Sequence, residues 1–188
     1  NYFISQNDRL AANRYIADFS RLMRTILANM SADYIPFAKE CESLYDYLQL
    51  EHLRFGDKFD YSVEIQEGLT EEGLLVFPGM VQPFVENAIW HGVRGLEGRK
   101  GFVRINFFKE DSKMLRCRVE DDGIGRRLSN DRKSNLHVHH SRGIKIATER
   151  LDIINTLRQT SFKIAVDDLS PDREEPGTVV TIDIPYKN

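Results

Sequence analysis

The spacing of apolar residues changes near Gly56, and this change limits the folds open to the chain. Over residues 10–30 apolar side chains recur at steps of three and four, as one face of an amphipathic helix requires. Residues 37–55 repeat that spacing. Over residues 59–65 apolar and polar residues instead alternate, which predicts a half-buried strand. The pattern therefore predicts a pair of helices followed by a sheet.

The same comparison of helical and alternating spacing predicts the remaining elements after residue 65. Strands linked as hairpins, with helices grouped between them, predict an α+β domain with an antiparallel or mixed sheet covered on one face by helices. Residues 167–177, rich in Pro, Asp and Glu, are expected to form a solvated hairpin loop. The expected elements are helices over residues 78–93 and 144–157 and strands over 102–109, 114–120, 162–166 and 178–184.

The first two helices are expected to form an antiparallel hairpin, because the link between them is short. On the second helix Tyr47, Leu50 and Leu53 widen the apolar stripe beyond what a single partner helix covers. The leftover apolar surface predicts pairing with another copy of the chain. Packing of the whole hairpin on its own domain is the alternative.

Composition narrows the class of protein. With 188 residues, the chain can bury one domain core plus a helical extension. Its net charge of -3 gives no electrostatic basis for binding nucleic acid. Cys41 and Cys117 lie far apart within apolar patterns, which favours buried, reduced thiols over a disulfide. The chain begins without a methionine, and we expect it to be a piece of a longer protein.

The expected helix over residues 78–93 carries polar residues beside its buried stripe. Asn87 and His91 are one turn apart and lie on the flank of the apolar face. An amide oxygen can bind a hard cation, and Mg²⁺ is commonly held by one or two protein ligands together with phosphate oxygens. Taken alone, this helix is equally consistent with ordinary surface polar residues.

An acidic, glycine-rich turn ends the expected strand over residues 114–120. The ionised carboxylate of Asp121 can only accept hydrogen bonds, so at the end of a buried strand it can select an exocyclic amine such as that of adenine. Gly123 and Gly125 leave room for the backbone to approach a flat ring or to take positive φ. Such turns also end plain hairpins and resemble calcium loops, but the preceding Asn87 helix makes the combination more specific.

Residues 82–92 and 119–125 together resemble the Asn box and the Asp-x-Gly-x-Gly box of sensor histidine kinases, most closely the LytS-like branch. The resemblance covers nearly the whole chain. It implies a two-layer α/β sandwich of the Bergerat (GHKL) ATP-binding type over residues 57–188. It also implies that residues 1–56 are a partial dimerisation and histidine-phosphotransfer hairpin that lacks the phosphoacceptor histidine.

The resemblance assigns roles to individual residues. It makes Asn87 the Mg²⁺ ligand, places His91 beside the nucleotide at the catalytic centre, and makes Asp121 the residue that recognises adenine. Gly123 and Gly125 would shape the base pocket. Glu86, which precedes the metal ligand, would polarise the accepting imidazole. The implied cofactors are ATP and Mg²⁺.

The lid and the pocket floor complete the implied site. The basic loop before Arg142 is suited to closing over phosphates, and Gly143 opens the helix that follows, so free amides face an anion there. Thr178 follows Gly177 at the pocket floor. Lys145 stands where the family often has a second lid glycine, and Trp90 where many sensor kinases have lysine. These departures bear on affinity and rate.

The function implied is transfer of the ATP γ-phosphoryl group to a histidine absent from this chain, and from there to a response regulator. The chain should bind ATP without phosphorylating itself. The expected partners are a second copy through the hairpin and a receiver domain, in the cytoplasmic region of an inner-membrane sensor. Alternatives are a non-catalytic nucleotide-sensing or dimerisation module and a GHKL-type ATP hydrolase. Hydrolases carry a glutamate one turn before the Asn, where this chain has Pro83.

Overall fold

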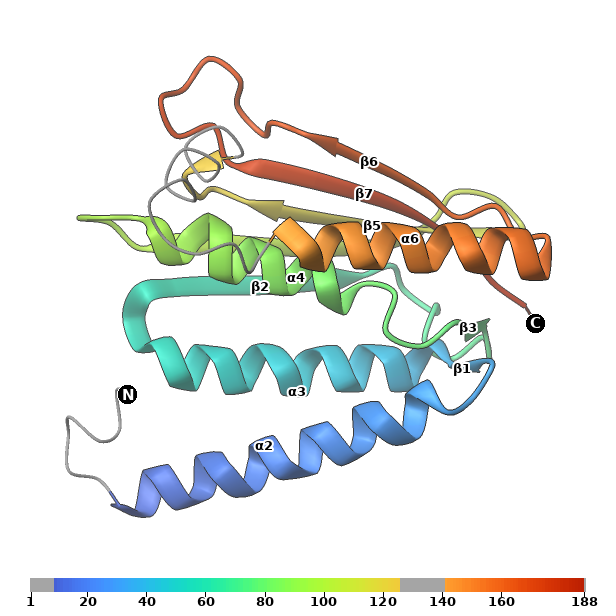
Figure 1. Ribbon diagram of the computed structural model, residues 1–188, viewed down its shortest axis with the longest axis horizontal. Coiled ribbons are helices and arrows are strands. Elements are labelled where there is room, and N and C mark those ends of the chain that lie inside the picture. Colours follow the sequence, from blue (N-terminus) through green and yellow to red (C-terminus); the bar gives the residue numbers. More distant parts are fainter. Residues whose placement is uncertain (1–8, 126–140, 188) are drawn as a thin grey trace.

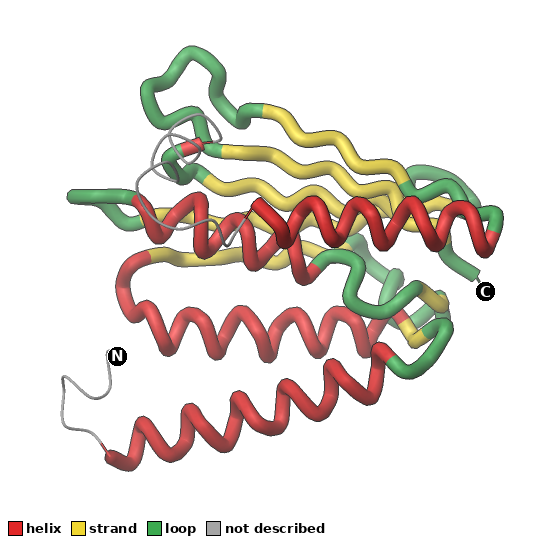
Figure 2. Tube along the Cα trace, in the orientation of Figure 1, coloured by secondary structure: helices red, strands yellow, loops and turns green. Residues whose placement is uncertain are grey.

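The structure is a computed structural model that describes residues 9–125 and 141–187 (Figure 1). Helices precede a sheet, and further helices are inserted between its strands (Figure 2). The elements are α2 (Arg9–Met30), β1 (Ile35–Pro36), α3 (Phe37–Phe55), η1 (Gly56–Lys58), β2 (Phe59–Ile65), β3 (Leu75–Val76), α4 (Gln82–Asn87), η2 (Ala88–Gly92), η3 (Val93–Gly95), β4 (Gly101–Lys109), β5 (Met114–Asp121), α6 (Ser141–Arg158), β6 (Lys163–Asp167) and β7 (Thr178–Pro185).

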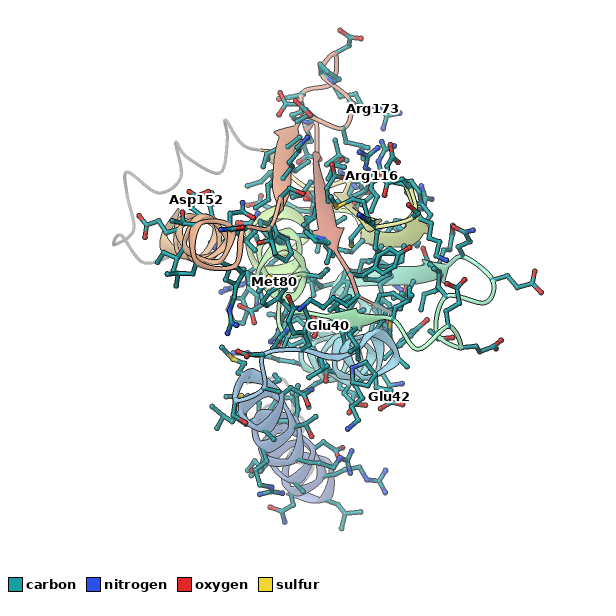
Figure 3. All side chains as sticks on the ribbon, turned by 90° about the vertical axis from the view of Figure 1, so that its right-hand side faces the viewer. Glu40, Glu42, Met80, Arg116, Asp152 and Arg173 are labelled. Carbon is teal, nitrogen blue, oxygen red and sulfur yellow. The ribbon has the colours of Figure 1, made fainter. Side chains whose placement is uncertain are left out.

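The main sheet is five-stranded and mixed, as the sequence predicts. Its strand order is β2-β4-β5-β7-β6, with β2 parallel to β4 and the other pairs antiparallel. Helices α3, α4 and α6 cover one face, and α2 lies outside this layer against α3 (Figures 1 and 3). The architecture is therefore the expected two-layer α/β sandwich.

Alternation along the strands places every second side chain in the core. In β5, Leu115, Cys117 and Val119 are buried, and α3 supplies Phe37 and Cys41 to the same cluster. The Phe37 ring packs edge-on against Phe107 of β4, with ring centroids 5.2 Å apart. Both cysteines are free and buried, as expected. Since α3 shares the sheet's core, the hairpin and the sheet form one packed unit, and the division at residue 56 stays a prediction.

Helix α2 is held to α3 but leaves most of its apolar stripe uncovered. Leu22 is only 3% exposed, and the Asn29 side chain donates a hydrogen bond of 3.1 Å to the Ser43 hydroxyl. Other large apolar side chains of the hairpin face solvent, namely Leu10, Ile16, Phe19, Met23, Leu27, Met30 and Leu53. In the described ranges no helix has both the length and the apolarity needed to cross a membrane.

The helix expected over residues 78–93 begins later and changes its winding. Gly79 has φ +67°, so residues 78–81 form a turn, and the helix starts at Gln82. The buried Glu40 carboxylate of α3 accepts bonds of 3.0 and 3.2 Å from the amides of Gly79 and Met80. Pro83 fits the first helical turn, where its missing N–H is not needed. The α-helix ends at Asn87 and continues as the π-helical turn η2.

Candidate functional site

A buried carboxylate lies at the end of the central strand β5. Asp121 is only 3% exposed, and its Oδ1 accepts a 3.0 Å hydrogen bond from the Gly123 amide. Thr178, its register partner on β7, also hydrogen-bonds to this carboxyl group. Burial raises the pKa of Asp121 to about 7, partly offset by these hydrogen bonds. The site thus holds a hydrogen-bond acceptor whose charge changes near neutral pH.

Glycines near this carboxylate have no room for a side chain at their own positions. A Cβ on Gly92 would lie 2.4 Å from Asp121 Oδ1, and a Cβ on Gly123 would lie 2.2 Å from the Gly92 carbonyl carbon. The Gly177 amide donates a 3.1 Å bond to the Gly123 carbonyl. Backbone from η2, from the turn after β5 and from the start of β7 therefore meets around Asp121.

The predicted polar residues of the preceding helix lie on α4 and η2. Asn87 and His91 are both half-buried, one at the end of the α-helix and the other within the π-helical turn. Gln82 donates a 3.0 Å bond to Glu86, and desolvation raises the pKa of Glu86 although much of its side chain is exposed. π-Helical turns are often found at functional sites. Through Gly92, this turn joins the Asn87 helix to Asp121.

Trp90, one of the departures, is packed between cationic side chains. The guanidinium carbons of Arg54 and Arg94 lie 4.5 and 4.8 Å from the indole ring, and Phe55 packs edge-on at 5.3 Å. Arg54 also donates to Glu51, whose other carboxylate oxygen is buried without a partner in the described structure. This cluster connects the C-terminal end of α3 to the turn that carries His91.

The lid lies mostly outside the described residues. Arg142 and Gly143 lie in the first turn of α6, and Lys145 follows in the next turn. The surroundings of their side chains are outside the described part of the structure. The basic loop over residues 126–140 also lies outside them. Gly125 is described: it has φ +76°, and a Cβ there would lie 2.5 Å from Pro176 Cγ.

Some residues around Asp121 come from other loops and were not predicted from the sequence. Gly92 ends the segment over residues 82–92 and had no predicted role, although a glycine at the end of a polar helix was an available signal. Arg99 and Glu175 gave no local signal, yet Arg99 Nη1 lies 2.8 Å from Asp122 Oδ2 and Nη2 lies 3.0 Å from Glu175 Oε2. These residues brace the segment next to Asp121.

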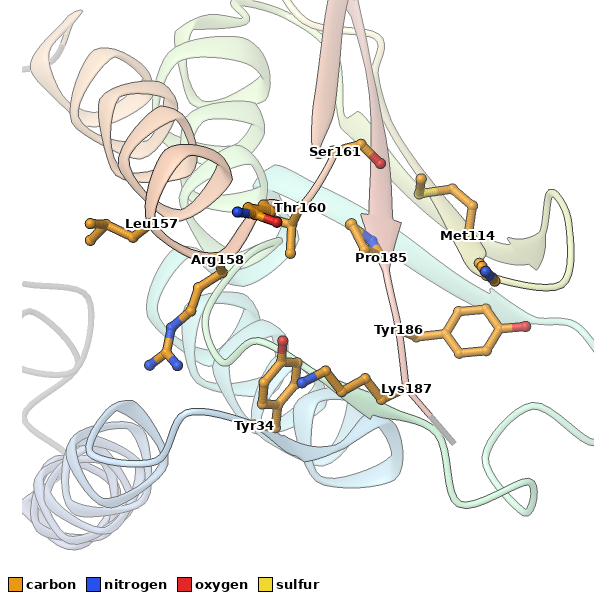
Figure 4. Close-up of a pocket in the computed structure, with 11 residues that line it drawn as sticks. Tyr34, Met114, Leu157, Arg158, Thr160, Ser161, Pro185, Tyr186 and Lys187 are labelled. Atoms are coloured by element: carbon orange, nitrogen blue, oxygen red, sulfur yellow. The ribbon is translucent and has the colours of Figure 1, made fainter.

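A separate pocket of about 600 Å³ opens elsewhere in the molecule (Figure 4). It contains none of the predicted site residues. Two of its three cationic residues are engaged within the protein: Arg158 lies 2.6 Å from Asp33, and Lys187 lies 4.0 Å from the centre of the Tyr34 ring. The lining residues are Tyr34, Lys113, Met114, Leu157, Arg158, Gln159, Thr160, Ser161, Pro185, Tyr186 and Lys187.

Comparison with known sequences places the chain among histidine kinases. Residues 1–59 match the family model described as histidine kinase. The chain is 29% identical over 186 residues to the sensor protein LytS of Oceanobacillus iheyensis, covering 96% of this chain and 30% of LytS. It is 33% identical over 151 residues to the sensor histidine kinase YpdA of Escherichia coli, covering 73% of this chain and 26% of YpdA. The chain thus spans under a third of these curated relatives.

Solved structures agree on the fold. The catalytic domain of the histidine kinase ThkA superposes with a TM-score of 0.51 at 18% identity, covering 81% of this chain and 93% of that domain. Full-length ShkA in complex with AMPPNP gives a TM-score of 0.56 at 17% identity, covering 98% of this chain and 37% of ShkA. The fold is thus that of a histidine kinase catalytic domain. The family model, the LytS relatives and the structural neighbours together support a LytS-like sensor histidine kinase.

Proposed function

We propose that this chain binds ATP and Mg²⁺ as the catalytic region of a two-component sensor histidine kinase. The buried Asp121 carboxylate carries this proposal, because it offers an acceptor to an adenine amine at a place where Gly92 and Gly123 bring backbone close to it. The family match and the fold support the same reading.

The residues present fit both groups. Positions 92, 123 and 177 each exclude a Cβ, so at these three positions only backbone lies next to Asp121. The described residues contain no cluster of three or more His, Cys, Asp or Glu side chains that could hold a metal. A metal bound mainly through phosphate oxygens needs no such cluster, and Mg²⁺ with Asn87 as its protein ligand is of this kind.

Each predicted residue has one part in the proposed reaction. Bound ATP and Mg²⁺ supply the phosphoryl group and neutralise its charge. Asp121 and Thr178 orient the base, and Asn87 fixes the metal. Glu86 would polarise the accepting imidazole and His91 would lie beside the nucleotide, while the backbone amides at Gly143 and the Arg142 cation would hold the phosphates. Catalysis then rests on positioning and charge neutralisation.

The proposed acceptor is a histidine outside this chain, and the onward partner is a receiver domain. A homodimer formed through the hairpin would bring the acceptor and the nucleotide together. The parent protein is proposed to be a membrane sensor with this region in the cytoplasm. Pro83 lies in the first turn of α4, where GHKL hydrolases carry their water-activating glutamate, and this disfavours ATP hydrolysis as the function.

Asn87→Ala is expected to remove the Mg²⁺ dependence of ATP binding. Loss of the amide ligand should raise the Kd for ATP with Mg²⁺ about tenfold, toward the value without metal. Calorimetric titrations with and without Mg²⁺ measure this. Asn106→Ala makes the same change on β4 and should leave both titrations unchanged. No binding by the unaltered chain at millimolar ATP would overturn the proposed function.

Leu27→Glu is expected to weaken self-association through the hairpin. Leu27 is 63% exposed within the uncovered apolar stripe of α2, and a buried unpaired carboxylate at a helix interface is strongly unfavourable. The dimer dissociation constant should rise at least about tenfold by sedimentation equilibrium. Thr25→Glu, an exposed position on the same helix, is the matched control. Equal dimerisation of both variants would show that this stripe does not form the interface.

A further inference from the structure

Arg99 joins separate loops next to the buried Asp121. Its Nη1 donates a 2.8 Å bond to Asp122 Oδ2, and its Nη2 also donates to the Asp122 backbone carbonyl. Its Nε and Nη2 lie 3.2 and 3.0 Å from Glu175 Oε2. The guanidinium donors therefore face protein acceptors on both sides, in the fork geometry that lysine cannot reproduce.

Asp122 is fixed on its other side by the sheet. Its Oδ1 accepts a 2.7 Å bond from the Phe102 amide, and its own amide donates to the Phe102 carbonyl at 3.2 Å. With Arg99 on the remaining oxygen, both carboxylate oxygens of Asp122 are bound. The backbone at residue 122 directly precedes Gly123, whose amide donates to Asp121. The position of Asp122 thus sets the position of the amide that orients Asp121.

Glu175 connects Arg99 to the floor of the site. Pro176 follows it and packs where a Cβ on Gly125 would lie, 2.5 Å from Pro176 Cγ. The next residue, Gly177, donates to the Gly123 carbonyl at 3.1 Å. One guanidinium therefore links the loop before β4, the turn after β5 and the loop before β7.

We propose that Arg99 is a positioning residue for the nucleotide base: it holds the Asp121 turn and the loop before Thr178 in register, through Asp122 and Glu175. This inference rests on the proposed ATP site and adds a residue to it. Arg99 is 40% exposed at its side chain, so its separate ion pairs should each contribute little to stability. Its effect should therefore appear in the site more than in the fold.

Arg99 also pairs with the charged group next to Asp121, the Asp122 carboxylate. The groups that act on Asp121 are the Asp122 carboxylate, the Gly123 amide and Thr178. Arg104 and Glu120 line a small hollow beside it, and η2 contributes the Gly92 backbone. The charge of Asp122 favours the protonated form of Asp121 and so raises its pKa. Arg99 lies 2.8 Å from that carboxylate, so its removal should leave the Asp122 charge unneutralised and make Asp121 harder to ionise.

The test measures ATP binding by calorimetry across about pH 6–9 for Arg99→Ala and Arg99→Lys. Arg99→Ala should raise the Kd about three- to tenfold and move the midpoint of its pH dependence upward by about half a unit. Arg99→Lys retains the charge without the fork. It should restore the midpoint while leaving part of the affinity loss.

Arg116→Ala is the matched control. Arg116 lies near the start of β5, away from Asp121, and forms a comparable double ion pair with Asp183 at 2.7 Å and Glu110 at 2.9 Å. It should lower thermal stability to a similar extent without changing the Kd or the midpoint. If Arg99→Ala behaves like Arg116→Ala, the positioning role is wrong.

A measurement without nucleotide separates this inference from the proposed function. The carboxyl carbon of Asp121 can be titrated by NMR in the unliganded chain, where Arg99→Ala should raise its midpoint and Arg99→Lys should not. An unchanged midpoint in Arg99→Ala overturns the proposed charge balance. If the Asp121 titration midpoint shifts but the chain binds no ATP, the charge balance holds and the role of Arg99 in positioning a nucleotide is overturned.

Discussion

Asp121→Asn should lower ATP affinity by about 100-fold while making the folded chain more stable above about pH 7. The amide carries no negative charge to attract the adenine amine, and its NH₂ group competes with that amine as a donor. The neighbouring glycines hold the residue too tightly for a side-chain shift to compensate, since a Cβ on Gly92 would lie 2.4 Å from Oδ1. Calorimetry at a single pH measures the loss.

The gain in stability follows from the raised pKa of Asp121. Burial moves the pKa from 3.8 to about 7, so the folded chain holds a proton that the unfolded chain releases in this window. Stability therefore falls as pH rises from about 4 to 7, and ionised Asp121 opposes folding by about 2–4 kcal/mol above that range. Asparagine removes this opposition because it stays neutral.

Denaturant unfolding of both chains at about pH 5 and pH 8 measures the difference. The variant should be the more stable chain at the higher pH, with a smaller difference at the lower pH. Binding by the unaltered chain should weaken as pH falls through about 7, while residual binding by the variant stays flat. Asp183→Asn, a paired carboxylate at the other end of the sheet, should show neither effect. A variant less stable at pH 8 would contradict the assigned pKa.

Local pattern accounts for what the sequence predicted well. The strands follow from alternation within a few residues, and the Asp121 turn follows from a carboxylate and glycines spaced two apart. The predicted start of the helix at residue 78 was wrong because a distant residue determines where α4 begins. Glu40 accepts hydrogen bonds from the amides of residues 79 and 80, and Gly79 takes positive φ. The glycine is visible in the sequence, but its contact with Glu40 is not.

The contacts that hold the site in place could not be predicted from the sequence either, because they also join residues that are distant in the chain. Arg99 and Glu175 are 76 positions apart, and each belongs to a charged loop that reads as solvated surface. The stacking of Arg54 on Trp90 likewise depends on α3 packing beside η2. Local chemistry can nominate an acceptor such as Asp121, whereas the residues that hold it in place become visible only once the chain is folded.

Gly177→Ala should lower stability by about 3 kcal/mol and also weaken ATP binding. Gly177 has φ +64°, which is unfavourable by roughly 1 kcal/mol for alanine. Its Cβ would also lie 2.2 Å from the Asp121 backbone oxygen, a contact that only a backbone shift can relieve. That shift would move β5 at the residue proposed to bind adenine, so the loss of stability and the loss of binding have one origin.

Gly73→Ala separates these contributions. Gly73 has φ +70°, yet nothing lies within 4 Å of a Cβ placed there. This control should therefore lose only the roughly 1 kcal/mol due to the backbone conformation and should bind ATP normally. Urea unfolding and calorimetry on both variants give the comparison. If Gly177→Ala destabilised the chain no more than Gly73→Ala, or bound ATP normally, close backbone contact at Asp121 would not be what requires glycine at this position.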